Sequence, residues 1–252
     1  MVFNITECVD FHHGKRIVIT ILVCGHDVVI IMHKEGDALL IQQPVYYPFR
    51  EVIEDNGRIF VNNQLHYEDG KYTIDFEDFE KKIVDNNVKV FILCNPHNPV
   101  GRVWTKEELE KMGDICLKHN VVIMDDEIHC DFTYPGFKFT SFMTLDEKYH
   151  NSLVLYTSPS KTFNVAGLQP ANIIIKNPEL RAAYRKANAA AGYSQGSIMG
   201  QVAVKSVYTK GDEWVNELVE YITGNMNYMR DFVKENFPKA HFVDPEGTIL
   251  PG

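Results

Sequence analysis

The sequence lacks a disulfide framework, a basic patch and a run of apolar residues long enough to cross a membrane. Its five cysteines are odd in number and show no C-x-x-C spacing, which disfavours both disulfides and a structural zinc site. Lysine and arginine number 25 against 34 aspartates and glutamates, so nucleic acid and anionic membranes are poor partners. The longest apolar runs, residues 17–23 and 28–32, follow no secretory signal. We therefore expect a soluble, cytoplasmic protein.

Several enzyme fingerprints are also absent. The sequence contains no G-x-G-x-x-G and no G-x-x-x-x-G-K-[ST], which removes the ordinary motifs for dinucleotides and nucleoside triphosphates. Nothing resembles the nucleophile elbow of serine hydrolases. A cofactor site, if there is one, must therefore be built from other segments.

Strand-like and helix-like segments alternate from about residue 38 onward, which indicates an α/β domain. The apolar runs that we predict to be strands span residues 38–41, 88–93, 121–124, 153–156 and 173–175. They lack strict alternation, as expected for a mainly parallel sheet covered by helices on both faces. With 252 residues, 45% of them hydrophobic, the chain can bury a core of its own.

Three helices have readable signals. Thr105 and Glu108 form a capping-box pattern, and Asn177 followed by Pro178 provides a cap and a first-turn proline. A longer amphipathic pattern over residues 212–234 predicts a helix beyond the usual globular length. Such a helix could lead into another domain.

Four polar segments each follow a predicted strand: residues 43–48, 95–101, 125–129 and 158–164. Ligands of open α/β sheets bind at the carboxyl ends of strands, so these loops can converge on one site. Each segment also has a plainer interpretation. The first can be two packed tyrosines, the second a structural turn, the third a set of metal ligands and the fourth a solvated loop.

In order and spacing, the four segments resemble the large-domain signature of fold-type-I enzymes that use pyridoxal 5′-phosphate (PLP). Residues 126–129 and 160–164 are most similar to the cystathionine β-lyase group of C–S lyases, and the resemblance covers roughly residues 37–248. It implies a three-layer α/β/α, PLP-dependent transferase-like large domain with a mainly parallel sheet. From the resemblance we expect the small C-terminal domain of the family to be largely missing.

The resemblance implies a set of cofactor contacts. The residues are Tyr46, Asn98, Asp126, Ile128, His129, Ser158, Ser160 and Lys161. Lys161 corresponds to the Schiff-base lysine, which also moves the substrate Cα proton as general acid and base. Asp126 corresponds to the carboxylate that pairs with the pyridine nitrogen. Tyr46 and Ile128 would cover the two ring faces.

The remaining contacts concern the polar substituents of the cofactor. Asn98 and His129 correspond to residues near the 3′-oxygen, and Ser158 and Ser160 to residues near the phosphate. Together these assignments imply β-elimination from a sulfur-containing L-amino acid, with pyruvate, ammonia and a thiol as products. The family also implies a homodimer.

The chain departs from the family pattern at several places. Gly25 is only a partial match to a phosphate-binding turn, and Gln169 stands where many members carry arginine. We expect a divergent N-terminal segment at 1–36, a PLP-binding large domain at 37–208, and an interdomain helix with the start of a truncated small domain at 209–252. The arginine that normally binds the substrate carboxylate would lie beyond this part of the family pattern.

Three functions stay open at this stage. The first is an active C–S β-lyase, whose nearest competitor is a class I/II aminotransferase of the same fold. The second is a catalytically inactive PLP-binding or regulatory relative. The third is an incomplete domain that binds no cofactor.

Overall fold

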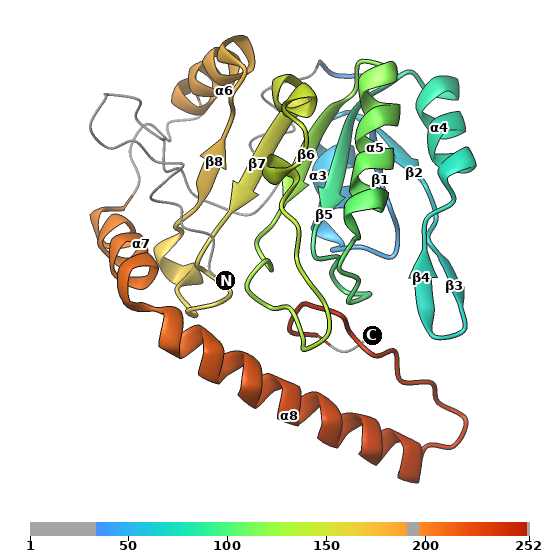
Figure 1. The fold of residues 1–252 in the computed structure, drawn as a ribbon. Helices are drawn as coiled ribbons and strands as arrows, with labels where there is room; N and C mark the ends of the chain where they lie inside the picture. The colour runs from blue at the N-terminus through green and yellow to red at the C-terminus, as the bar shows by residue number, and fades with distance from the viewer. Residues whose placement is uncertain (1–33, 191–196, 251–252) are drawn as a thin grey trace.

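The computed structural model describes residues 34–190 and 197–250, and within them a mainly parallel sheet organises the fold (Figure 1). The strand order is β2-β1-β5-β6-β7-β8. The strands are β1 (Ala38–Ile41), β2 (Ile59–Asn62), β5 (Val88–Cys94), β6 (Val122–Asp126), β7 (Leu153–Thr157) and β8 (Asn172–Ile174). Neighbouring strands of this sheet are parallel except for the antiparallel pair β7 and β8. The predicted fold class is confirmed.

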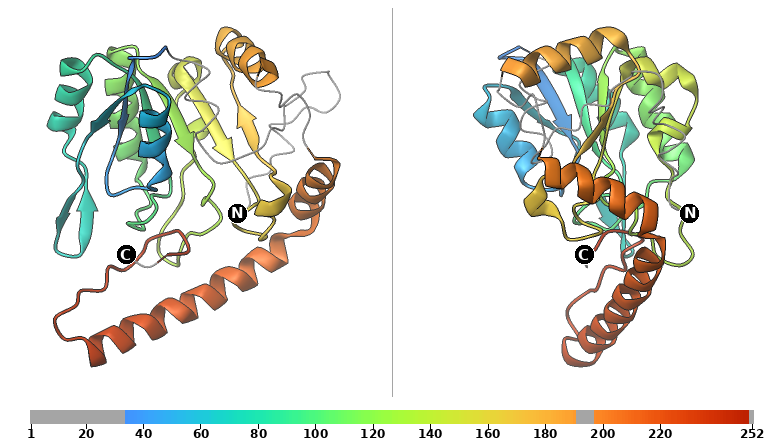
Figure 2. Two further views of the ribbon diagram at one scale, coloured as in Figure 1. Left: turned by 180° about the vertical axis from the view of Figure 1, so that it is seen from behind. Right: turned by 90° about the vertical axis from the view of Figure 1, so that its left-hand side faces the viewer.

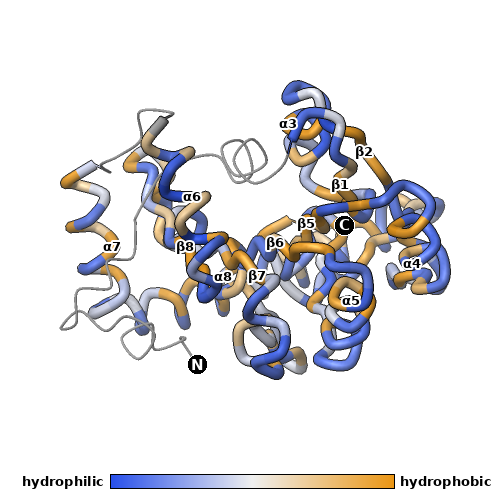
Figure 3. Tube along the Cα trace, turned by 90° about the horizontal axis from the view of Figure 1, so that it is seen from above, coloured by the Kyte–Doolittle hydropathy of each residue, from blue (hydrophilic) through white to orange (hydrophobic). Residues whose placement is uncertain are grey.

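Helices cover both faces of the sheet. On one face lie α4 (Phe76–Asp85) and α5 (Lys106–Lys118), and on the other lie α3 (Pro48–Asp55) and α6 (Pro178–Ala190). The edge-on view in Figure 2 shows α3 and α5 on opposite sides. Successive strand residues point to opposite faces, so Leu40 packs beneath α4 and α5 whereas Leu39 and Ile41 pack beneath α3. Both faces are apolar, and Figure 3 shows hydrophobic residues concentrated along the strands between the helices.

The predicted helix starts are confirmed by hydrogen bonds. At the start of α5, the Glu108 amide donates to Thr105 Oγ1 at 3.2 Å, and the Thr105 amide donates to Glu108 Oε2 at 2.8 Å. At the start of α6, Asn177 Oδ1 accepts from the amides of Glu179 and Leu180 at 2.8 and 3.2 Å. Side chains thus satisfy backbone donors that have no partner within the helix.

The expected strands exist, with shifted ends. The strand predicted at 121–124 runs instead to Asp126, and the one predicted at 173–175 begins at Asn172. Short edge elements were not predicted: β2 and the separate antiparallel hairpin of β3 (His66–Glu68) and β4 (Lys71–Thr73). Their few residues carry too little hydrophobic periodicity to be read from sequence.

The long helix is confirmed as α8 (Asp212–Asn236), which follows α7 (Ile198–Lys210). Figure 1 shows it crossing below the carboxyl ends of β5, β6 and β7, after which the chain turns back toward that edge. None of the helices described here is long and apolar enough to cross a membrane. The expected N-terminal segment 1–36, with Gly25, falls almost entirely outside the described residues.

Candidate cofactor site

All four polar segments lie at one edge of the sheet. They follow β1, β5, β6 and β7, which are parallel neighbours in that order. The pairing register aligns Cys94 with Asp126 and Asp126 with Tyr156, so three of these strands end almost level. The predicted convergence of the segments is therefore found in the structure.

Hydrogen bonds join the segments pairwise. His97 Nε2 lies 3.0 Å from the Pro44 carbonyl oxygen and joins the loop after β5 to the loop after β1. Thr162 Oγ1 donates to Asp131 Oδ2 at 2.7 Å, which joins the loop after β7 to the loop after β6. These bonds thus tie the loops together in two neighbouring pairs.

The loop after β6 presents a buried carboxylate and a buried imidazole. Asp126 closes β6, is only 6% exposed, and accepts through Oδ1 from the amide of Ile128 at 3.1 Å. His129 is 3% exposed, and its Nδ1 has no hydrogen-bond partner within residues 34–190 and 197–250. Burial and, second, the charge of Lys161 lower the pKa of His129 to about 4. The imidazole is therefore neutral at physiological pH, and Lys161 lies close enough to affect it.

The loop after β7 carries Lys161 exposed between buried hydroxyl residues. Ser158 and Ser160 are 8% and 9% exposed. The Ser158 hydroxyl donates to the Pro170 carbonyl and accepts from the Ser160 amide at 3.1 Å, so its proton is already used within the loop. Lys161 itself projects from a turn that these bonds hold in shape.

Tyr46 and Asn98 lie at the same edge, each half-buried. The Tyr46 ring packs edge-on against Phe49, with ring centroids 5.7 Å apart. The backbone amide of Asn98 donates to Cys94 Sγ at 3.4 Å. Each residue thus contacts a near neighbour in the sequence, Phe49 for Tyr46 and Cys94 for Asn98.

Two buried acids next to the site are not among the predicted cofactor contacts. Asp125 and Glu127 flank Asp126 and are 0% and 2% exposed, and burial is the main cause that raises both of their pKa values. Glu127 Oε1 accepts from the Phe142 amide at 2.9 Å. The proximity of two acids in the sequence was visible, but their burial was not. Among the described residues, no group of three histidines, cysteines or acids is arranged to hold a metal ion.

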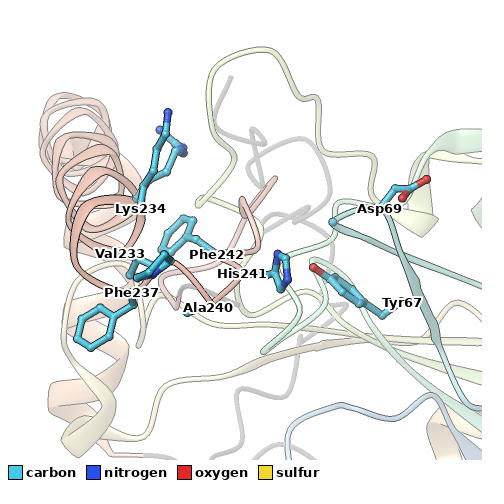
Figure 4. A pocket seen from close by; sticks show the side chains of 11 residues that line it. Tyr67, Asp69, Val233, Lys234, Phe237, Ala240, His241 and Phe242 are labelled. Atoms are coloured by element: carbon cyan, nitrogen blue, oxygen red, sulfur yellow. The ribbon is translucent and has the colours of Figure 1, made fainter.

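A cavity of about 460 Å³ lies elsewhere, between the β3–β4 hairpin and the end of α8. Figure 4 shows Tyr67 and His241 on its facing walls. None of the predicted cofactor contacts lines it. The candidate site is therefore at the carboxyl ends of the parallel strands, where the four loops converge, and not in this cavity.

Comparison with known proteins places this arrangement in a family. The chain matches the model for "Aminotransferase class I and II" over residues 24–251. It is 42% identical over 215 residues to cystathionine beta-lyase PatB of Bacillus subtilis, which covers 85% of this chain and 56% of that protein. It is 31% identical over 226 residues to the probable kynurenine–oxoglutarate transaminase BNA3 of Saccharomyces cerevisiae, covering 85% of this chain and 50% of that one.

A solved structure agrees with the sequence relatives. Cystalysin from Treponema denticola, which contains pyridoxal 5′-phosphate, superposes with a TM-score of 0.87 at 39% identity, over 90% of this chain and 57% of that one. The chain spans about half the length of the curated relatives that it matches. Because the family match covers nearly the whole sequence, this chain belongs to the aminotransferase class I and II family.

Proposed function

We propose that this chain binds PLP through Lys161 and, in its active form, acts as a C–S β-lyase on a sulfur-containing L-amino acid. The observation that carries the proposal is the convergence of four strand-end loops, with the neutral, buried His129 beside Lys161. The similarity to proteins named cystathionine beta-lyase supports the choice of reaction.

The residues present fit a pyridoxal ring. His129 Nδ1 is a buried polar atom without a partner among the described residues, and such atoms in native proteins call for a ligand or water to satisfy them. An oxygen substituent on an aromatic ring would satisfy it. The half-buried ring of Tyr46 offers a flat face, and the Asp126 carboxylate offers an acceptor for a ring N–H. Donors, acceptors and an aromatic face are therefore all available at one edge.

Each residue would act in a defined way on the bound amino acid. The cofactor, when bound, supplies a ring that accepts electrons from the substrate Cα. Lys161 Nζ would take the Cα proton, which allows the thiolate on Cβ to leave. Asp126 would hold the proton at the pyridine nitrogen. Asn98 and His129 would orient the ring through its 3′-oxygen.

The phosphate contact is a more limited proposal. Because the Ser158 hydroxyl already donates to Pro170, it can offer a phosphate only an acceptor unless that bond breaks. The Ser160 hydroxyl makes no hydrogen bond within the described residues, so its proton can be donated to a phosphate. We therefore assign phosphate binding to Ser160 first and to Ser158 second.

Replacing Lys161 by alanine tests the cofactor proposal. Purified wild-type chain mixed with PLP should gain a visible absorbance band that borohydride makes permanent, because a Schiff base is reduced to a stable amine. Lys161→Ala should lose the band entirely. Lys138→Ala, which removes an exposed lysine from another loop, is the matched control and should keep it. A permanent label that persists in Lys161→Ala would refute the proposal.

An aminotransferase is the second candidate, because the chain is also similar to a protein named as a transaminase. The loaded chain should release pyruvate from cystathionine without an added keto acid if it is a lyase. Amino transfer that depends on a keto acid, without pyruvate release from cystathionine, would favour the alternative. If neither occurs while the absorbance band forms, the chain binds the cofactor without catalysing either reaction.

A further inference from the structure

The chain that follows α8 returns to the strand edge and bonds to two of the site loops. We call residues 243–250 the C-terminal strap (red in Figure 1). The Glu246 amide donates to the Gly101 carbonyl at 2.7 Å, in the loop after β5. The Thr248 amide donates to the Phe132 carbonyl at 2.9 Å, in the loop after β6. The strap thus bridges the loop that carries Asn98 and the loop that carries His129.

A buried ion pair holds the strap to the first of these loops. Arg102 is 3% exposed, and its Nε donates to Glu246 Oε2 at 2.9 Å. The Val103 amide donates to the same carboxylate oxygen at 2.9 Å. On its other side Arg102 donates to both oxygens of Glu108, at 3.0 and 2.8 Å. Removing the charge of Glu246 would therefore leave the buried guanidinium with Glu108 as its one remaining carboxylate partner among the described residues.

The strap packs closely against both loops at two glycines. Gly101 has a φ of +73°, and a Cβ built there would lie 2.7 Å from Pro245 Cβ. A Cβ built at Gly247 would lie 2.7 Å from both the Phe132 carbonyl oxygen and Val103 Cγ2. Glycine at both positions therefore permits a close approach of strap and loops that any side chain would prevent.

We propose that Arg102 and Glu246 are positioning residues for the cofactor site. Their ion pair holds the strap against both loops, and the strap in turn fixes the segments that present Asn98 and His129. Neither residue is among the proposed cofactor contacts, so each acts through the loops. The inference rests on the proposed function, because the loops matter for catalysis only if they contact PLP.

The test substitutes Glu246→Gln in the full 252-residue chain and measures the rate at which PLP is released, far below the unfolding temperature. The amide keeps the shape of the side chain but loses its charge. We expect release on the order of tenfold faster, by analogy with the loss of a residue that supports a metal ligand. In the cofactor-free protein, amide hydrogen exchange should also rise in peptides covering residues 96–103 and 130–134.

Asp244→Asn is the matched control. Asp244 lies in the same strap and forms an exposed ion pair with Arg230, at 2.5 Å, which involves neither site loop. This variant should release PLP at the wild-type rate. If Glu246→Gln fails to fold, Tyr134→Phe replaces it, because it removes only the 3.0 Å bond from the Tyr134 hydroxyl to the Thr248 carbonyl. It should change release and exchange in the same direction, by a smaller factor.

The outcomes separate the two proposals. A wild-type chain that binds no PLP, or binds it equally well as Lys161→Ala, overturns the proposed function itself. A wild-type chain that binds PLP while Glu246→Gln releases it at an unchanged rate overturns only the positioning role. A lower unfolding temperature with unchanged release would show that the ion pair supports the fold and not the site.

Discussion

Helices α5 and α8 are both amphipathic, but they differ in how many of their apolar residues are buried. The 13 residues of α5 begin with a capping box and bury Leu109, Met112 and Cys116 completely against the sheet. The 25 residues of α8 begin at Asp212, after Gly211, which provides no side-chain cap, and only Val215 and Met226 are buried. The longer helix therefore has fewer of its residues held by the rest of the described chain.

One side of α8 carries aromatic residues at seven-residue intervals. Trp214, Tyr221 and Tyr228 are 54%, 70% and 71% exposed. Residues spaced by seven lie on one side of a helix, so these rings form a stripe. Apolar periodicity therefore identifies a helix but does not say whether other parts of the protein bury its apolar residues.

The largest contrast is expected from glycine to alanine changes in the two helices. At Gly113 in α5, a Cβ would lie 2.6 Å from Tyr149 Cε1, and Tyr149 is held by its bond to Asp114. We expect Gly113→Ala to lower the free energy of unfolding by about 1–3 kcal/mol. At Gly224 in α8, nothing lies within 4 Å of the added carbon. Gly224→Ala should stabilise by about 0.5–1 kcal/mol through helix propensity.

Urea denaturation followed by circular dichroism measures both changes. Opposite signs would support the contrast between a packed and an unpacked helix. A loss of stability in Gly224→Ala comparable to that in Gly113→Ala would mean that α8 is as closely packed as α5.

The free energy of unfolding should also depend on pH through the buried carboxyl group of Glu127. Burial raises the pKa of Glu127 from 4.5 to about 7, so the folded chain keeps a proton that the unfolded chain loses. The free energy of unfolding should therefore fall as pH rises from about 4.5 to about 7. Replacing Glu127 by glutamine removes this dependence. Between pH 5 and 7 the wild type should therefore lose stability relative to Glu127→Gln.

The difference between the two proteins is the quantity to measure. His97 and His129 have pKa values lowered to about 4, chiefly by burial, so their contribution to stability is lost as pH falls from 6.5 toward 4. That opposite trend is present in both proteins and cancels. Glu220→Gln, at an exposed position of α8, serves as the control and should give a curve parallel to wild type. Parallel curves for Glu127→Gln would contradict the prediction.

The smallest effect is expected at the helix cap. Thr105→Ala removes the hydroxyl that accepts from the Glu108 amide, and should cost about 1 kcal/mol. Thr223→Ala removes a hydroxyl from the interior of α8, where it only donates back to the Val219 carbonyl. It should change the free energy of unfolding by less than about 0.5 kcal/mol. Equal losses in the two variants would remove the distinction between a capped and an uncapped helix.

The fold was predictable where short-range chemistry determines it. The cap at Thr105, the cap at Asn177 and the central strands follow from side chains close to one another in sequence, and all are present. The β3–β4 hairpin was not predicted, because three-residue strands carry little periodicity. The ion pair of Arg102 with Glu246 joins residues 144 positions apart, and no local pattern indicates such a contact.

The location of the site was predictable, but several of its hydrogen bonds were not. Parallel neighbouring strands bring their carboxyl ends together, so the convergence of the loops follows once the strand order is known. The bond of His97 to the Pro44 carbonyl and the internal bond of Ser158 depend on side-chain packing and could not be predicted. The roles of the eight cofactor contacts, the homodimer, the domain boundaries and the cytoplasmic location remain predictions.

The distance along the chain between Arg102 and its two acidic partners has a consequence for biosynthesis. Glu108 lies six residues away, whereas Glu246 leaves the ribosome 144 residues later. Because domains generally fold as they are made, the guanidinium can enter the protein interior with Glu108 as its first counter-ion. Newly made sheet and loops would then exist for a time with one of the two carboxylates still to come, and the loops after β5 and β6 would be joined by the strap only once Glu246 had been made.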